Sequence, residues 1–321
     1  MHSLLIFHAM QILRSFDAAK NAGLDGCAIT IGNFDGVHMG HQQVLAELNG
    51  HAAALDDAKS VVITFEPHPR AFLFPEEAPR RLSHLHERLE DLKDAGVDAV
   101  LLLKFNQDLA SMSAEDFMRH IYNSLGFKHI HVGYDFAFGK GRQGQADMMR
   151  TLGDAHGFTV SEAAAFALDG AVVSSSRIRS AIEAADFDLT NDLLGRCYSI
   201  SGRVGHGEKR GRKMGFPTAN IQVKDLTHPP VGIYAAWSEY DGKMVKSAAY
   251  LGYRPTFNGR TLLLETHLLD TQQDLYGKRL KVHFVKRIRE DRAFVSADDL
   301  AAQIKADCDA AHQILDSHSP R

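Results

Sequence analysis

The stretch from Gly32 to His41, Gly-Asn-Phe-Asp-Gly-Val-His-Met-Gly-His, carries the clearest chemical pattern in this chain of 321 residues. It stands between a β-branched run and a helical pattern, a junction at which ligands usually bind in open α/β sheets. Its glycines allow a close approach of the backbone, and the unpaired N–H groups of a helix start favour an anion. His38 and His41, three residues apart, share one face of the first helical turn. We therefore predict that two imidazoles donate hydrogen bonds to the charge that develops when an α-phosphorus is attacked and pyrophosphate departs.

Two stretches in the second half of the chain also suit phosphate chemistry. The segment from Gly202 to Ile221 combines glycines with basic residues before a strand pattern, and such a donor-rich loop can wrap phosphates without a Walker sequence. Glu265 is set into the largely apolar strand pattern Thr261–Asp270. Burying a lone carboxylate is costly, so we expect Glu265 to have a function.

The first half of the chain, from Gly26 to about Ala184, alternates strand and helix patterns. The predicted strands are Cys27–Ile31, Ser60–Phe65, Asp98–Phe105, Lys128–Val132 and Phe158–Glu162. Between them lie the predicted helices His41–Leu55, Leu82–Ala95, Ala114–Leu125 and Gln145–His156. This alternation predicts an α/β domain with a parallel sheet covered by helices on both faces.

After about Gly195 the pattern changes to strands separated by turns. The predicted strands are Tyr198–Val204, Ala219–Val223, Gly232–Tyr240, Met244–Leu251, Thr261–Asp270 and Arg279–Ile288. They favour a small antiparallel barrel or sandwich, and Asp241-Gly242 has the signature of a tight hairpin. A final helix opened by Ser296 is expected to cover one end, and a helical connector is expected at Ile182–Leu194.

The composition is that of a globular protein, with 45% hydrophobic and 24% charged residues. A net charge of −4 does not favour a strongly cationic partner of nucleic acid or membranes. No apolar run approaches the ~20 residues that span a bilayer, and the N-terminus lacks the features of a signal peptide. Three separate cysteines without a Cys-x-x-Cys pair indicate a reduced, cytoplasmic protein. We expect no nucleic acid or membrane partner and a monomer or weak homo-oligomer, with Met10 as a hypothetical alternative to Met1 as the start.

Several look-alike motifs fail on spacing. Gly133 to Lys140 resembles a P-loop, but five residues separate its glycines and Gly141 stands where Ser or Thr must hold magnesium. Gly205 to Gly211 misses the dinucleotide fingerprint by one residue and follows no βαβ pattern. The pairs His84/His86 and His129/His131 lack metal-site spacing, and we interpret them as surface or strand residues.

Taken together, the motifs resemble those of the bacterial bifunctional riboflavin kinase/FMN adenylyltransferases, also called FAD synthetases. The resemblance in the first half comprises the stretch from Gly32 to His41, Thr64 to Arg70, the glycine-rich run from Val132 to Gly144, and Ser174-Ser175-Ser176-Arg177-Ile178-Arg179, in which Ser176 replaces a Thr. In the second half it comprises Gly202 to Ile221 with its Pro-Thr-Ala-Asn turn, Gly252 to Phe257, and Thr261 to Asp270. The resemblance implies a Rossmann-like nucleotidyltransferase domain at 10–184 and a riboflavin kinase barrel at 185–316.

The resemblance also implies site residues and ligands. It makes His38, His41 and Glu265 catalytic, with Glu265 the general base of the kinase, and makes Thr218 and Asn220 the ligands of Mg²⁺. The implied ATP contacts are Gly32, Asn33, Phe34, Asp35, Gly36, Ser175, Ser176, Arg177, Gly205, Gly207, Gly215 and Pro217, and the implied flavin contacts are Phe65, Pro67, His68, Asp135 and Phe136. The expected chemistry is riboflavin and ATP to FMN in the barrel, then FMN and ATP to FAD and pyrophosphate in the α/β domain.

Two other classes of function stay open at this point. One is a single-activity kinase, or a related nucleotidyltransferase whose acceptor is a pantetheine or nicotinate nucleotide. The Pro-Thr-Ala-Asn turn and Glu265 argue against it. The other is a non-catalytic flavin sensor or an RNA-binding module that uses the basic loop at 203–213. The intact candidate catalytic residues and the lack of a spaced aromatic set argue against that class.

Overall fold

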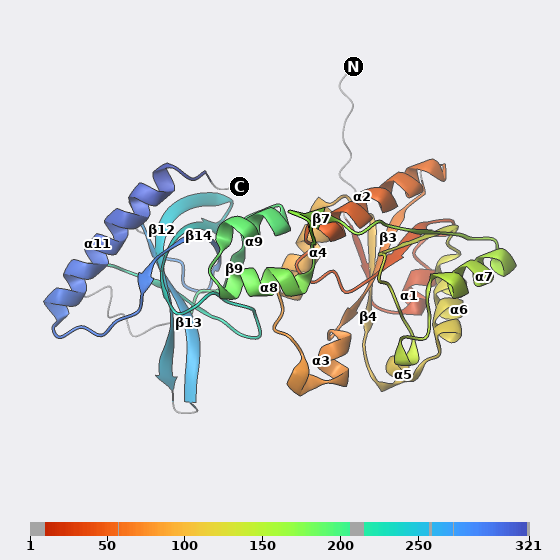
Figure 1. Ribbon diagram of the computed structural model, residues 1–321, viewed down its shortest axis with the longest axis horizontal. Helices are drawn as coiled ribbons and strands as arrows, with labels where there is room; N and C mark the ends of the chain where they lie inside the picture. The colour runs from red at the N-terminus through yellow and green to blue at the C-terminus, as the bar shows by residue number, and fades with distance from the viewer. Residues whose placement is uncertain (1–9, 57, 206–214, 257–258, 272, 320–321) are drawn as a thin grey trace, which may run out of the picture. The chain divides into compact units, whose positions relative to one another are not determined.

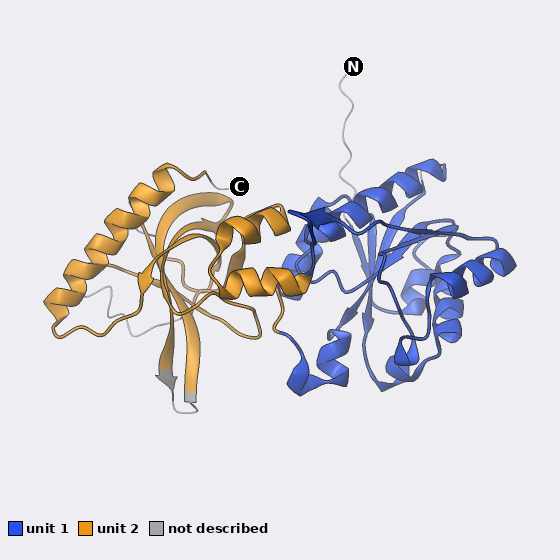
Figure 2. Ribbon diagram, viewed as in Figure 1, with its two compact units in different colours: residues 1–79, 83–174 blue, residues 80–82, 175–321 orange. Residues whose placement is uncertain are grey.

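The computed structural model describes residues 10–56, 58–205, 215–256, 259–271 and 273–319. The chain divides into two compact units (Figure 2). The first unit comprises residues 1–79 and 83–174, and the second comprises 80–82 and 175–321. The alternative start at Met10 concerns residues 1–9, which lie outside the described ranges, as does most of the basic loop, at 206–214.

A parallel six-stranded sheet forms the centre of the first unit, with strand order β1-β4-β3-β2-β5-β6. Its strands are β1 (Gln11–Leu13), β2 (Ala28–Ile31), β3 (Ser60–Glu66), β4 (Ala99–Lys104), β5 (His129–Val132) and β6 (Thr159–Glu162). Five of them match the predicted strands, and β1 is an addition that pairs with β4. With three residues, β1 is too short for its sequence to show a strand period.

Helices cover both faces of this sheet (Figure 1). Alternate residues of β3 show why, because Val61 and Ile63 pack into one apolar cluster and Val62 packs into the other. The helices of the unit are α1 (Phe16–Lys20), α2 (Met39–Ala54), α3 (Pro69–Leu73), α4 (Leu85–Asp94), α5 (Gln107–Ser111), α6 (Ala114–Leu125) and α7 (Ala146–His156), with short 3₁₀ turns η1 (Pro75–Glu77) and η2 (Lys140–Arg142) and a small hairpin of β7 (Ala167–Leu168) and β8 (Ala171–Val172). The predicted doubly covered parallel sheet is confirmed.

The second unit is a nearly closed antiparallel barrel with strand order β10-β13-β12-β11-β14-β9. Its strands are β9 (Ser199–Arg203), β10 (Ala219–Gln222), β11 (Gly232–Tyr240), β12 (Lys243–Thr256), β13 (Gly259–Leu268) and β14 (Arg279–Glu290). The two end strands approach each other where the N–H of Gly205 donates to the carbonyl oxygen of Asn220 at 2.9 Å. Of the two architectures that the strand pattern favours, a barrel and a sandwich, the structure has the barrel.

Among the described residues, the barrel unit has the helices α8 (Ser175–Glu183), α9 (Phe187–Leu194) and α11 (Ala297–Asp316). Ser296 caps α11 as expected, because its side chain accepts from the N–H of Asp299. A bidentate ion pair of Arg289 with the buried Asp307, at 2.8 and 2.7 Å, ties α11 to β14. No helix in the described part of the chain is long and apolar enough to cross a membrane.

Candidate active sites in the two units

The loops that carry the predicted residues of the first unit meet at one edge of its sheet. β2 pairs in parallel with β3 on one side and with β5 on the other. The carboxyl ends of neighbouring parallel strands lie at the same edge. The loop after β2, from Gly32 to His41, is therefore flanked by the loops that follow Glu66 and Val132. Strand pairing alone brings the candidate nucleotide and flavin residues of this unit to one place.

The loop after β2 has a strained backbone. Phe34 has a φ of 51°, Gly36 of 84° and Val37 of 37°. A positive φ is a clear outlier for a β-branched residue such as Val37, and strain of this kind persists only where the surroundings impose it. Phe34, Asp35 and Val37 are almost fully buried, so the surrounding core holds the loop in this shape.

His38 and His41 form a stacked pair at the start of α2. Their ring centroids are 3.7 Å apart and their planes differ by 14°. His38 is the N-cap, and its Nδ1 accepts the N–H of His41 at 3.3 Å. That bond leaves the ring proton of a neutral His38 on Nε2. Burial, and then the neighbouring His38, lower the pKa of His41 well below its usual value, so His41 is neutral at pH 7. Its Nδ1 is buried and has no hydrogen-bond partner among the described residues.

Arg88 on α4 connects this loop to the end of β3, a role that the sequence analysis missed. Its guanidinium is fully buried and donates to the carbonyl oxygens of Asn33 at 3.0 Å and Phe65 at 3.2 Å. It also pairs with the carboxylate of Glu66 at 2.8 Å. One buried cation therefore fixes the spacing between the histidine loop and the neighbouring loop. An arginine inside a helix pattern gave no signal for this role, because its partners are mostly backbone atoms.

The five predicted flavin contacts lie on the two flanking loops. Phe65 at the end of β3 is partly buried against the core, Pro67 follows a cis peptide bond, and His68 is buried. The Nδ1 of His68 accepts the N–H of Arg70 at 3.1 Å and so caps α3. After β5, Asp135 is exposed, and Phe136 stacks on Phe138 with centroids 5.4 Å apart. Their contact with flavin stays a prediction.

Ser175, Ser176 and Arg177 form the first turn of α8, which belongs to the second compact unit. Ser175 and Arg177 are partly buried and Ser176 is exposed. The structure assigns these three residues to a different unit from His38 and His41, so their joint action on the triphosphate stays a prediction.

In the barrel, the strand register brings two of the predicted residues together. Asn220 of β10 lies directly opposite Glu265 of β13. Directly opposite residues of an antiparallel pair point to the same face of a sheet. Thr218 precedes Asn220 by two residues, and the Nδ2 of Asn220 donates to the Thr218 carbonyl oxygen at 3.3 Å. The side-chain oxygen of Asn220 has no hydrogen-bond partner among the described residues.

Arg254 of β12 holds Glu265 in place, another role that the sequence analysis did not find. Its Nε and Nη2 lie 2.9 and 2.7 Å from Oε1 of Glu265, whose side chain is 16% exposed. Both contacts go to Oε1, which leaves Oε2 without a partner among the described residues. Tyr250, also opposite Glu265, donates to Asp291 at 2.9 Å. Burial, and then Asp291, raise the pKa of Tyr250 to about 12, so it stays a neutral donor.

A pocket lies beside the predicted turn of the barrel. Its lining residues are Val204, Pro217, Thr218, Ala219, Asn220, Thr266, Leu268, Thr271, Gln273, Asp274, Leu275 and Tyr276. Glu265 is not one of them, although it faces Asn220 across the strands. Of the three predicted glycines, Gly205 closes the barrel, Gly215 has a φ of 88°, and Gly207 lies outside the described residues. A hydroxyl and an amide oxygen beside a pocket are a donor set that suits a hard cation such as Mg²⁺.

Comparison with known proteins gives two family matches, one for each part of the chain. Residues 20–177 match the model of the FAD synthetase family and residues 194–315 match that of riboflavin kinase. A bifunctional riboflavin kinase/FMN adenylyltransferase of Pseudomonas fluorescens is 46% identical over 291 residues, 90% of this chain and 93% of that protein. Proteins of the same name from Haemophilus influenzae and Escherichia coli K12 are 41% and 38% identical, over 96% and 93% of this chain and 100% and 96% of theirs.

A solved structure matches along almost the whole chain as well. It is a crystal structure described as a macrolide-efflux protein from Streptococcus pneumoniae, with a TM-score of 0.84 and 29% identity. The match covers 97% of this chain and 100% of the other. The two-unit architecture is therefore shared with a protein whose structure is known.

The clamp of Arg88 gives a first testable prediction. Replacing Arg88 by Met leaves two backbone carbonyls without their buried donor, and we expect the first unit to lose about 2–3 kcal/mol of stability. This loss in the free energy of unfolding is measured by urea titration, with hydrogen exchange in peptides from β2 and β3 as the reporter of the first unit. Arg119→Met, which removes an exposed pair with Asp116, is the matched control and should cost less than ~1 kcal/mol. Equal losses in the two variants would contradict the clamp.

The buried His41 gives a second prediction, on acid stability. In the unfolded chain His41 takes up a proton as the pH falls through ~6.5, whereas its lowered pKa keeps it neutral in the folded unit. Protonation therefore favours the unfolded state, so stability is lost as the pH falls below ~6.5. His129 and His131, whose pKa values are also lowered, add to the loss. We expect the protection of the α2 amides against hydrogen exchange, relative to the unfolded chain at the same pH, to fall less between pH 7 and pH 5 in His41→Gln than in the wild type. An equal loss of protection in the two proteins would show that His41 is not held neutral.

Proposed function

This chain belongs to the family of bifunctional riboflavin kinase/FMN adenylyltransferases, and from that premise we propose which residues carry out its two reactions. The FAD synthetase domain is N-terminal and the riboflavin kinase domain is C-terminal. The substrates riboflavin, FMN and ATP follow from these activities. One observation carries the assignment of residues: His38 and His41 lie in one compact unit, and Thr218, Asn220 and Glu265 lie in the other.

In the first unit, we propose that a phosphate oxygen of FMN attacks the α-phosphorus of ATP. The new P–O bond forms as the bond to the β-phosphate breaks, and pyrophosphate leaves. His38 donates a hydrogen bond from Nε2, because its Nδ1 accepts the N–H of His41. The neutral His41 donates a hydrogen bond from its one ring N–H. Both act together with the N-terminal N–H groups of α2 on the negative charge of the transition state. The strained loop of Gly32, Asn33, Phe34, Asp35 and Gly36 holds the nucleotide against this pair.

The flanking loops supply the proposed flavin contacts. Phe65, Pro67 and Phe136 offer apolar surface to a flat ring, and Asp135 and His68 offer polar atoms to its edge. Because β2 separates β3 from β5 in the sheet, these two loops lie on either side of the histidine pair. Ser175, Ser176 and Arg177 are proposed to bind the pyrophosphate as it leaves, with the fixed charge of Arg177 as the main contribution.

In the second unit, we propose that Glu265 accepts the proton of the terminal ribityl hydroxyl of riboflavin. The hydroxyl oxygen attacks the γ-phosphorus of ATP, and ADP leaves. Arg254 holds Oε1 of Glu265, so Oε2 is the atom that takes the proton. Because phosphoryl transfer depends mostly on positioning and electrostatics, the fixed carboxylate also orients the attacking hydroxyl. Gly205, Gly207, Gly215 and Pro217 are proposed to lie against the nucleotide.

Thr218 and Asn220 are the proposed ligands of Mg²⁺ in the kinase. The side-chain oxygen of Asn220, which has no partner in the described part of the chain, and the hydroxyl of Thr218 beside the pocket are suited to this ion. When bound, Mg²⁺ would neutralise charge on the phosphates of ATP. We further propose a cytoplasmic monomer or weak homo-oligomer without a nucleic acid or membrane partner, supported by the low net charge and by three free cysteines.

A variant of the histidine pair tests the first assignment. His38→Ala removes a donor to the transition state, and we expect FAD formation from FMN to fall by ~10²–10³, while FMN formation from riboflavin stays near the wild-type rate. The assay is incubation with riboflavin or FMN, ATP and Mg²⁺, followed by chromatographic separation of the flavins. His86→Gln, an exposed histidine of the same unit, is the control. Equal loss of both activities in His38→Ala would contradict the assignment.

A variant of the barrel tests the second assignment. Glu265→Gln keeps the shape of the side chain but removes its basicity, and we expect riboflavin phosphorylation to fall by ~10²–10⁴. Conversion of added FMN to FAD should be unchanged. Glu290→Gln, at an exposed position on β14, is the matched control. Kinase activity of Glu265→Gln near that of the wild type would remove Glu265 as the base.

A further inference from the structure

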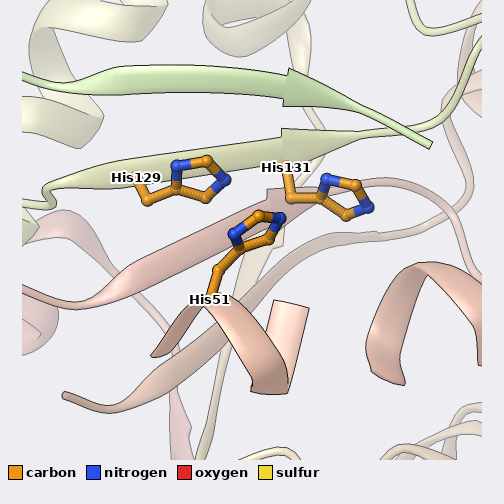
Figure 3. Close-up of side chains that lie close together, drawn as sticks. All are labelled: His51, His129 and His131. Carbon is orange, nitrogen blue, oxygen red and sulfur yellow. The ribbon is translucent and has the colours of Figure 1, made fainter. Parts of the chain in front are cut away.

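Three histidines of the first unit meet in a place that the two reactions do not use. His51 projects from α2 toward His129 and His131 on β5 (Figure 3). His129 and His131 are two residues apart on one strand and so point to the same face of the sheet, the face on which α2 packs. Each histidine offers one ring nitrogen, and these nitrogens all lie within 4.8 Å of one another. The sequence analysis found no metal-site spacing in His129 and His131, because the third imidazole comes from a distant helix.

The outer nitrogens of the two strand histidines each lie close to an oxygen atom of a neighbouring side chain. Nε2 of His131 lies 2.8 Å from Oε2 of Glu47, which is one helical turn before His51 on α2. The pair has the distance of an ion pair but not the alignment of a hydrogen bond, and the neighbouring carboxylate, which can only accept, favours the tautomer of His131 with its proton on Nε2. Nδ1 of His129 lies 2.7 Å from Oγ1 of Thr159, whose hydroxyl also lies 3.4 Å from the Lys128 carbonyl oxygen. When that hydroxyl donates to Lys128, it accepts from Nδ1 of His129.

These outer contacts turn two lone pairs toward the centre of the cluster. Nε2 of His129 and Nδ1 of His131 lie 2.8 and 2.7 Å from Oγ of Ser161, and Nε2 of His51 lies 3.3 Å from the same atom. A single hydroxyl has one proton and can satisfy only one lone pair. A cation at the centre would satisfy all three at once. The centre therefore has the donor geometry of a cation site.

The charge state of the cluster agrees with this geometry. Burial, followed by the neighbouring imidazoles, lowers the pKa of His129 to about 4. Burial is also the main cause that lowers the pKa of His131. Both rings are therefore neutral at pH 7, which is the form that binds metals.

We propose that His51, His129 and His131 bind a divalent transition-metal ion, for which Zn²⁺ is the best match, with Glu47 as the positioning residue of His131. Three imidazole ligands suit Zn²⁺, whereas Mg²⁺ prefers oxygen ligands. Zn–N bonds of about 2.0–2.1 Å require the nitrogens to close in, which rotation of the Ser161 hydroxyl away from the centre permits. A water molecule would supply the fourth ligand. The contact of His131 with Glu47 is the carboxylate–histidine arrangement that commonly supports such sites.

The site is separate from the adenylyl-transfer centre and has a structural consequence. His51 follows His41 by ten residues on α2, about 15 Å at 1.5 Å per residue. A metal there joins the second half of α2 to β5, and so fixes the helix whose first turn carries His38 and His41. The partial exposure of His51 provides a path of entry for the ion.

The test uses the full chain after removal of metals with a chelator. Zn²⁺ alone is titrated by calorimetry, and Co²⁺ is titrated as a spectroscopic probe whose visible absorption reports tetrahedral coordination. We expect one high-affinity ion per chain and a tetrahedral Co²⁺ spectrum, both lost in His129→Gln and in His131→Gln. Glu47→Gln keeps all three ligands and should weaken Zn²⁺ binding by about 10–100-fold.

The control is His86→Gln, because His86 and Glu90 form an exposed histidine–carboxylate pair at 3.2 Å on α4, outside the cluster. It should bind Zn²⁺ as the wild type does. Retained conversion of FMN to FAD by the cluster variants establishes that they are folded. The proposal is overturned if the wild type binds no Zn²⁺, or if His129→Gln and His131→Gln, while active, bind Zn²⁺ with the wild-type affinity. In that case the cluster is a hydrogen-bonded part of the core.

Discussion

The parallel pairing of β2 with both β3 and β5 is the constraint on which the proposed active site of the first unit depends. It places the loop with His38 and His41 between the two loops of the predicted flavin contacts. The pairing of the strands fixes only where the loops begin. The buried Arg88 fixes the spacing between the loop after β2 and the end of β3. The proposed adenylyl-transfer site is therefore held by backbone hydrogen bonds and one buried cation, and its histidines are not needed to hold the loops together.

In the barrel, the antiparallel register of β10, β13 and β12 positions the proposed site residues. Placing Asn220 opposite Glu265 brings the proposed metal-binding amide and the proposed general base to one face of two adjacent strands. A slip of one residue would turn either side chain to the other face. Arg254, on the third strand, then fixes the carboxylate. The two reactions share ATP as a substrate. The residues proposed for adenylyl transfer are positioned by a parallel sheet, and those proposed for phosphorylation are positioned by an antiparallel one.

The sequence predicted both architectures because its periodicities are clear. The run Ser60–Phe65 alternates between two apolar clusters, and the strand Gly232–Tyr240 was located with its observed bounds. Contacts between distant segments could not be predicted. Arg88 binds backbone carbonyls, Arg254 meets Glu265 across a strand pair, and His51 meets His129 from another element. Such contacts depend on how elements pack, and a single sequence does not encode this as a local pattern.

We infer that the chain contains two catalytic centres, one for each reaction. The most direct test mixes His38→Ala with Glu265→Gln and supplies only riboflavin, ATP and Mg²⁺. We expect the mixture to form FAD, because FMN released by His38→Ala is adenylylated by Glu265→Gln, whereas a chain carrying both substitutions forms none. Absence of FAD from the mixture, although each variant still catalyses its own remaining step, would contradict the account.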